Sequence, residues 1–196
     1  MKKRAFFGKL FFLIQEREMD RLQEIAVFYR DNLENKKFKL IAGKKGKTIT
    51  LIISFLSGHF FHLAGLHKLN DIAQLKAKKD IVYKNILDGK ISLENVKKST
   101  KYKDIKNRIK YFEAIKEALF AKEIMIKSLQ GYFFNIKADY MLTYKNSGGG
   151  YAHLFLKGDS DAVPVTYILH PKDTYLQNNP NKWTVLSVEE IVDKNI

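Results

Sequence analysis

The chain has 196 residues, of which 45% are hydrophobic and 13% aromatic, so it can form a buried core and is not a disordered polymer. It contains no cysteine, which excludes disulfides, thiol catalysis and cysteine-ligated zinc and suits a reducing, cytoplasmic location. Its formal net charge at pH 7 is +14. This length predicts one domain over residues 1–196.

The positive charge is concentrated in the first two-thirds of the chain. Residues 131–196 contain 6 Lys and 7 Asp or Glu, a net charge of −1, whereas residues 1–130 carry a net charge of +15. A basic region of this size indicates a polyanionic partner, and nucleic acid fits better than a membrane surface. A general bias toward lysine is the alternative explanation.

The first residues, MKKRAFFGKLFFLI, combine a basic start with an apolar run. Lys9 interrupts this run, and no small-residue cleavage site follows it, so a signal peptide is not predicted. No apolar stretch reaches the roughly 18 residues that a membrane span needs. We expect residues 1–14 to form an extension with a short buried helix rather than a basic membrane anchor.

Residues 15–130 are predicted to be mainly helical, with an early hairpin. Apolar residues recur at three- and four-residue steps over residues 15–33, which predicts an amphipathic helix. Two β-branched runs joined by GKKGK predict a β-hairpin at about residues 38–55. The linker is not a P-loop, because two residues rather than four separate its glycines and a strand follows it.

Further helices are expected between this hairpin and residue 127. Asn70-Asp71, Asp80 and Ser92 are candidate N-caps for short helices, and a longer helix is expected from Thr100 to Lys127.

From Tyr132 onward the pattern changes to runs of strand length separated by glycine, asparagine and proline clusters. This pattern predicts an antiparallel meander of about four strands in residues 131–196. The predicted fold class is α+β, with N-terminal helices and a β-hairpin packed with the C-terminal meander.

Three of the five histidines lie in the stretch HFFHLAGLHK at residues 59–68, the densest group of side chains that exchange protons near neutral pH. His59 and His62 are three residues apart, and His67 follows five residues later. The zinc motif HExxH would need a glutamate between its histidines, and no acid follows His59 until Asp71, so no metal is predicted. The alternative is that these histidines are half-buried packing residues among phenylalanine and leucine.

A ribonuclease that uses no metal would need fewer catalytic groups than a zinc enzyme. The RNA 2′-hydroxyl supplies the nucleophile, and the protein supplies a base, an acid and cations near the phosphate. Histidine suits the proton transfers because its unperturbed pKa lies near 6.5, and lysine and arginine suit the phosphate. His62 or His67, together with Lys68, would meet this need.

Seven cations fall within fourteen residues, on and before the helix expected from Thr100. They are Lys97, Lys98, Lys101, Lys103, Lys106, Arg108 and Lys110. Such a run suits a phosphate backbone, and its alternative is a solvated helix face. Arg108 stands out because it is the only arginine after Arg30 and because its planar fork binds phosphate in a way that lysine cannot.

The strand region contains a third candidate group. His153 lies on one expected strand and His170 ends another, with Tyr167, Lys172 and Tyr175 close by. A tyrosine, histidine and lysine grouping at one end of a sheet would also serve as an RNA-cleaving site. Ordinary surface placement is the alternative for His153 and Lys172.

The segments HFFHLAGLHKL, IVYKNILDGKIS and KKSTKYKDIKNRIKYFEAI resemble the PBECR domains, and most of all their fourth group. These phage and mobile-element domains are related to the barnase, EndoU, colicin and RelE-like nucleases. The resemblance covers about residues 20–190 and is densest over residues 55–120. It implies a metal-independent RNA-cleaving fold of the BECR type, with helices on a four-stranded antiparallel sheet, and a role in conflict between phages, plasmids and hosts. The site residues that it reaches are His62, His67, Lys68 and Arg108.

Together these observations predict a cytoplasmic, toxin-like endoribonuclease that needs no cofactor. Its expected partners are RNA, or another nucleic acid, and an immunity or antitoxin protein. Additional candidate site residues are His59, His153, Tyr167 and His170. One alternative is a nucleic-acid-binding module without catalysis that uses only the run Lys97–Lys110. Another is a structural protein of a mobile element whose charge reflects coding bias.

Overall fold

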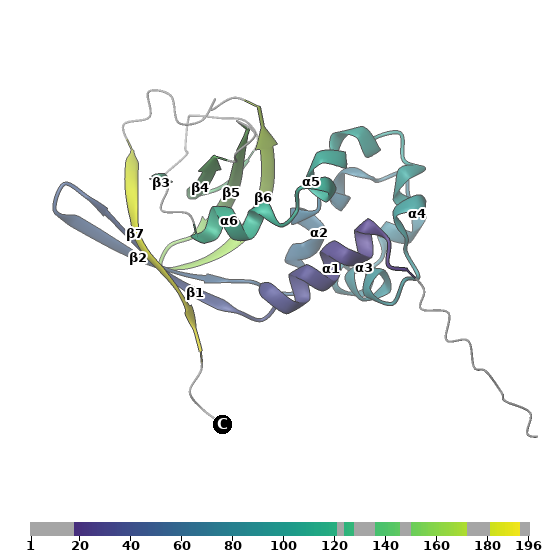
Figure 1. The fold of residues 1–196 in the computed structure, drawn as a ribbon, viewed down its shortest axis with the longest axis horizontal. Helices are drawn as coiled ribbons and strands as arrows, with labels where there is room; N and C mark the ends of the chain where they lie inside the picture. The colour runs from purple at the N-terminus through teal and green to yellow at the C-terminus, as the bar shows by residue number, and fades with distance from the viewer. Residues whose placement is uncertain (1–17, 121–123, 128–135, 146–149, 172–180, 193–196) are drawn as a thin grey trace, which may run out of the picture.

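The computed structural model describes residues 18–120, 124–127, 136–145, 150–171 and 181–192 (Figure 1). The predicted extension at residues 1–14 and the first residues of the helix expected over 15–33 lie outside these ranges. So do Lys172 and Tyr175. Within the described residues, no helix combines the length and the apolar character needed to cross a membrane.

Most of the helices lie together on one side of the molecule and the strands on the other, with α6 packed against β4 and β5 (Figure 1). The α-helices are α1 Arg21–Asn32, α2 His59–Leu63, α3 Lys79–Leu87, α4 Leu93–Lys97, α5 Lys106–Lys110 and α6 Ala114–Phe120. The 3-10 helices are η1 Leu66–Lys68, η2 Ala73–Lys76 and η3 Tyr102–Asp104. The strands are β1 Lys37–Lys44, β2 Lys47–Ser54, β3 Ile124–Lys127, β4 Tyr140–Lys145, β5 Tyr151–Gly158, β6 Asp161–His170 and β7 Lys182–Ile191. The predicted α+β class is confirmed.

The β-hairpin expected at residues 38–55 is present as β1 and β2. Its turn places Lys45 and Gly46 at φ angles of 47° and 76°, respectively. Two successive positive φ angles give the turn a twist that matches a two-stranded ribbon. The basic linker is therefore a tight hairpin turn and not a phosphate loop.

Helix α1 begins at Arg21 because the Asp20 side chain accepts hydrogen bonds from the backbone N–H groups of Leu22 and Gln23, at 2.9 and 3.0 Å. The second carboxylate oxygen of Asp20 accepts a hydrogen bond of 2.6 Å from the backbone N–H of Leu93. One carboxylate thus caps α1 and ties it to the start of α4.

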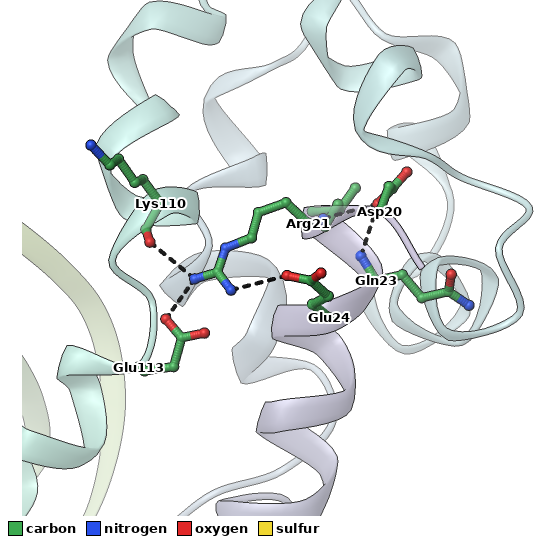
Figure 2. Close-up of polar contacts among 7 residues, drawn as sticks. Asp20, Arg21, Gln23, Glu24, Lys110 and Glu113 are labelled. Carbon is green, nitrogen blue, oxygen red and sulfur yellow. Dashed lines mark hydrogen bonds and ion pairs between the residues drawn. The ribbon is translucent and has the colours of Figure 1, made fainter. Parts of the chain in front are cut away.

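Arg21 connects α1 to the turn between α5 and α6 (Figure 2). Its guanidinium donates to the backbone carbonyl of Lys110 at 2.9 Å and to Glu113 at 2.6 Å, and it also pairs with Glu24 at 3.2 Å. Because Lys110 is the last residue of α5, this arginine holds the end of the helix that carries Arg108.

The long helix predicted from Thr100 to Lys127 is wrong. This stretch contains η3, α5, α6 and the strand β3, and residues 121–123 are not described. Ile105, Phe112 and Ile115, three of the apolar residues that suggested one helix face, are buried. Their periodicity reflects burial in a chain that turns repeatedly, and a run of short helices keeps the same spacing.

Two of the three expected N-caps also differ from prediction. Ser92 caps α4 as expected, in a capping box with Asn95. Lys78, however, is the N-cap of α3, so Asp80 lies inside its first turn. Asp71 accepts hydrogen bonds from the Ser99 hydroxyl at 2.6 Å and from the Thr100 N–H at 2.9 Å. These bonds lower the pKa of Asp71 to about 2.

The strands pair in the order β1-β2-β6-β5-β4-β3-β7 within the described residues, and β7 pairs back onto β1, so the sheet curls round and closes. The predicted meander covers β4, β5 and β6, whereas β7 lies beside β3 and β1. The β2–β6 pair is parallel and short, joining Ile52 and Ile53 to Asp161 and Ala162. Past Ala162, this edge of β6 pairs with no other described strand, and α2 and α5 contact β6.

The hydrophobic core is continuous from the helices into the sheet. At its centre, the rings of Tyr29, Phe60, Tyr83 and Phe112 meet with centroids 5.0 to 6.4 Å apart. Phe60 belongs to α2, so burial of this ring fixes the rotation of the helix that carries the first histidines.

Candidate active site

His62 and His67 lie side by side at one edge of the helical part, with ring centroids 5.0 Å apart. Helix α2 buries Phe60 and Leu63 in the core, which leaves His62 half-exposed on the other side. His67 is in the 3-10 helix η1, and its side chain is exposed to solvent. Both imidazoles can therefore reach a ligand.

The turn between α2 and η1 depends on Gly65, which has a φ angle of 81°. Its N–H donates to the carbonyl of His62, and its carbonyl accepts from the N–H of Lys68. A Cβ atom at this position would lie 2.8 Å from Ile105 Cγ2 and 3.0 Å from Arg108 Cδ. The positive φ and this close approach both favour glycine, which lets η1 pack directly on α5.

Arg108 is 7% exposed, and its Nη1 donates to the Thr166 hydroxyl on β6 at 3.0 Å. The guanidinium therefore joins α5 to the part of β6 that follows the short β2 pairing. Arg108 was predicted from its chemistry, whereas Thr166 carried no signal in the sequence. The contact appears only in the folded structure, because Arg108 and Thr166 are 58 residues apart in the sequence.

Five groups that carry or can take up a positive charge influence one another here: His62, His67, Lys68, Lys79 and Arg108. Desolvation, reinforced by the charges of His62, Arg108, Lys68 and Lys79, lowers the pKa of His67 to about 4. Desolvation and Lys79 lower the pKa of His62. Desolvation and the charge of Arg108 also lower the pKa of Lys68, while Asp104 opposes this shift. Both histidines are thus mainly neutral at pH 7.

A groove with a volume of about 720 Å³ opens beside His62. It is lined by residues 56–59, His62 and residues 76–80. The last segment reads KAKKD and contains three exposed lysines, Lys76, Lys78 and Lys79. These lysines were not predicted as site residues, although their run of charge is visible in the sequence.

His59 lies near this pair but is held by the backbone. Its Nδ1 accepts a hydrogen bond of 3.1 Å from the N–H of Leu56. Desolvation, followed by the charges of His62 and Lys79, lowers the pKa of His59. A neutral His59 whose Nδ1 is already an acceptor helps to shape the groove wall.

The basic run Lys97–Lys110 is not a single helical face. It extends over α4, η3 and α5 and the turns between them. Its lysines, Lys97, Lys98, Lys101, Lys103, Lys106 and Lys110, are all exposed. Lys97 forms an ion pair of 2.6 Å with Glu94. Among the cations of this run, Arg108 alone is buried. The close approach of Ile105, just after η3, to Gly65, just before η1, shows that these two 3-10 helices lie near each other.

His153 and His170 form a separate group on the sheet. His153 is fully buried on β5, where its Nδ1 lies 3.0 Å from the Thr143 hydroxyl and its ring stacks on Tyr151. Burial and the charge of His170 lower the pKa of His153 to about 4. His170 pairs with Tyr151 across the β5–β6 ladder.

Tyr167 is also fully buried, and its hydroxyl donates to the carbonyl of Tyr111 at 2.9 Å. Burial raises its pKa, and the nearby Arg108 opposes that effect. Tyr167 therefore lies close to Arg108, and its hydroxyl ties β6 to the chain segment just after α5.

Among the described residues, no group of three or more His, Cys, Asp or Glu side chains has a geometry that could hold a metal ion. The convergent side chains are cationic or become cationic on protonation, and their chemistry suits an anion.

The family described as phage-Barnase-EndoU-ColicinE5/D-RelE like nuclease4 (PBECR4) matches residues 21–196. The chain belongs to this family. The match begins at α1 and includes both the convergent basic groups and the closed sheet. Searches of curated proteins and of solved structures find no match to this chain. This PBECR4 chain therefore has a nuclease-like function, and nucleic acid is its substrate class.

Proposed function

We propose that the protein is an endoribonuclease that cleaves RNA without a metal ion, through attack of the 2′-hydroxyl on the adjacent phosphate. The convergence of His62, His67, Lys68 and Arg108 at one solvent-accessible edge carries this proposal. Membership of a nuclease family supports nucleic acid as the ligand.

The phosphate is held by Lys68 and Arg108. Desolvation by burial, followed by repulsion from the charge of Arg108, lowers the pKa of Lys68. A phosphodiester between them removes the repulsion and stabilises both cations. The guanidinium that donates to Thr166 has a defined orientation, which favours charge-assisted hydrogen bonds to phosphate oxygens.

The two histidines transfer the protons. His67 is exposed and, with its pKa of about 4, neutral at pH 7, so it serves as the base that removes the 2′-hydroxyl proton. The 2′-oxygen then attacks phosphorus, and the bond from phosphorus to the 5′-oxygen breaks. His62 serves as the acid that protonates this leaving oxygen, since the bound phosphate raises the pKa of the neighbouring imidazole. The products are a 2′,3′-cyclic phosphate and a 5′-hydroxyl.

The second candidate function is nucleic-acid binding without catalysis, which the six exposed lysines of the run Lys97–Lys110 favour. Binding of this kind falls steeply with salt and does not depend on the histidines. The toxin-like role, the immunity or antitoxin partner and the cytoplasmic location remain predictions.

The test is cleavage of a labelled single-stranded RNA by the purified protein in EDTA. We expect products with cyclic phosphate ends, and no cleavage of the matched 2′-deoxy strand, because it lacks the nucleophile. A His62→Ala, His67→Ala double variant is the control for a contaminating nuclease. Equal cleavage by this variant, cleavage of the DNA strand, or intact RNA after prolonged incubation would each contradict the proposal.

A further inference from the structure

We propose that the groove beside His62 is a subsite for single-stranded RNA, in which Lys76, Lys78 and Lys79 bind a phosphate next to the one being cleaved. This inference rests on the proposed function, because it extends the same site by one or more nucleotides.

The groove is continuous with the reacting groups. His62 is part of its lining, and the positive charge of Lys79 contributes to the lowered pKa values of His59, His62 and His67. A strand whose phosphate lies at Lys68 and Arg108 therefore has a path past His62 into the groove. The volume of about 720 Å³ is in the range that holds a small organic ligand, and the groove is open to solvent.

The charge of the groove suits a phosphate. Its three lysines are exposed, and Asp80 is the one acid among the residues that line it. Exposed lysines interact with phosphate as point charges and tolerate any base sequence. The groove would therefore bind the strand without reading its sequence.

The other segment that lines the groove, residues 56–59, is held in place by hydrogen bonds before any ligand binds. The hydroxyl of Tyr29, itself fully buried, donates to the carbonyl of Leu56 at 2.7 Å, and the N–H of Leu56 donates to His59 Nδ1. The Leu56 side chain is nevertheless 54% exposed. A hydrogen-bonded segment with an exposed leucine, in the same groove as three lysines, provides contact for a base and charge for its phosphate.

The test uses DNA oligonucleotides that contain a single ribonucleotide, so that each has one cleavable position. The strand is extended by one to three deoxynucleotides on its 5′ side or on its 3′ side. We compare the wild-type protein with a variant in which Lys76, Lys78 and Lys79 are changed to Gln. The matched control changes three exposed lysines of the sheet, Lys37, Lys39 and Lys157, to Gln.

We expect extension on one side to lower KM on the order of tenfold in the wild-type and control proteins, as for several weak surface ion pairs acting together. The groove variant should lose this gain, so that its KM no longer depends on extension of the strand on that side. An equal gain in the groove variant would overturn the subsite and leave the proposed function standing.

If none of the proteins cleaves RNA, the proposed function fails and a binding measurement still decides the subsite. Fluorescence anisotropy with a 2′-deoxy 12-mer is recorded over a range of salt concentrations. The groove variant should show a smaller dependence of log K on log salt than the control, by roughly 0.7 for each phosphate that its lysines no longer neutralise. Identical slopes would overturn the subsite.

Discussion

The His62–His67 pair and His153 contain the same side chain in two different environments. His62 and His67 lie half-exposed or exposed beside Lys68 and Arg108, whereas His153 is fully buried between Thr143 and Tyr151. Desolvation is the largest cause of a lowered pKa in all three. A lowered pKa therefore does not identify a catalytic histidine, and access to a ligand together with neighbouring cations separates the two environments.

The largest expected effect is on catalysis at the exposed pair. His67→Ala or His62→Ala should lower kcat by roughly 10²- to 10⁴-fold, because each removes a proton-transfer group. The free energy of unfolding should change by only about 0.5 kcal/mol, since neither side chain is fully buried. The measurements are single-turnover RNA cleavage and urea unfolding.

His153→Gln is the matched control for this prediction. It should leave RNA cleavage near the wild-type rate if the protein remains folded. The comparison between the two environments breaks down if folded His153→Gln loses cleavage while His67→Ala keeps it.

A smaller effect is expected at Arg108. Arg108→Lys keeps the positive charge but removes the planar guanidinium. It should lower kcat/KM by roughly 10²-fold, the size of effect expected when a buried, hydrogen-bonded charge contact to a ligand is lost. Thr166→Val removes one hydrogen bond to the guanidinium and should cost about 1 kcal/mol, or roughly fivefold in kcat/KM. Arg30→Lys on the surface of α1 is the control and should change neither quantity. Equal activity of Arg108→Lys and wild type would show that the bidentate contact is not used.

The remaining effect is on stability rather than on catalysis and follows from His153. Its pKa is about 4 in the folded protein and near 6.5 in the unfolded chain, so between these values the unfolded chain binds more protons. The contribution of a neutral His153 is thus present above pH 6.5 and is lost as the pH falls toward 4. Urea unfolding at pH 7, 5.5 and 4.5 should show a decrease of up to about 3 kcal/mol from this group.

The His153→Gln variant isolates this contribution, because the other histidines with lowered pKa values remain in it. Its free energy of unfolding should fall less steeply between pH 6.5 and 4 than that of the wild type. Parallel curves for the two proteins would show that His153 has an ordinary pKa, and this would weaken the contrast with the exposed pair.

Local features of the fold could be predicted from the sequence. The β-hairpin at residues 38–55, the Ser92 cap and the strands from Tyr140 onward depend on turn chemistry and on side-chain alternation, which act over a few residues. The long helix from Thr100 failed because a three- to four-residue apolar period describes burial and does not distinguish one helix from several short ones. The neighbours of β7 could not be predicted, since strand order depends on contacts between distant segments.

The chemistry of the candidate site was also visible in the sequence. The histidine cluster at residues 59–68 and the isolated Arg108 were identified from residue type alone, because few side chains exchange protons at pH 7 or bind phosphate in a fork.

Only the tertiary structure decided which of these groups meet. Gly65 brings the turn after α2 onto α5, and β6 supplies Thr166 to orient Arg108. The tertiary structure also separates His153 from the site, because His153 is buried in the sheet. It places Lys76, Lys78 and Lys79 in the groove beside His62. Proximity between segments forty or more residues apart depends on packing of the whole core, which no local pattern encodes.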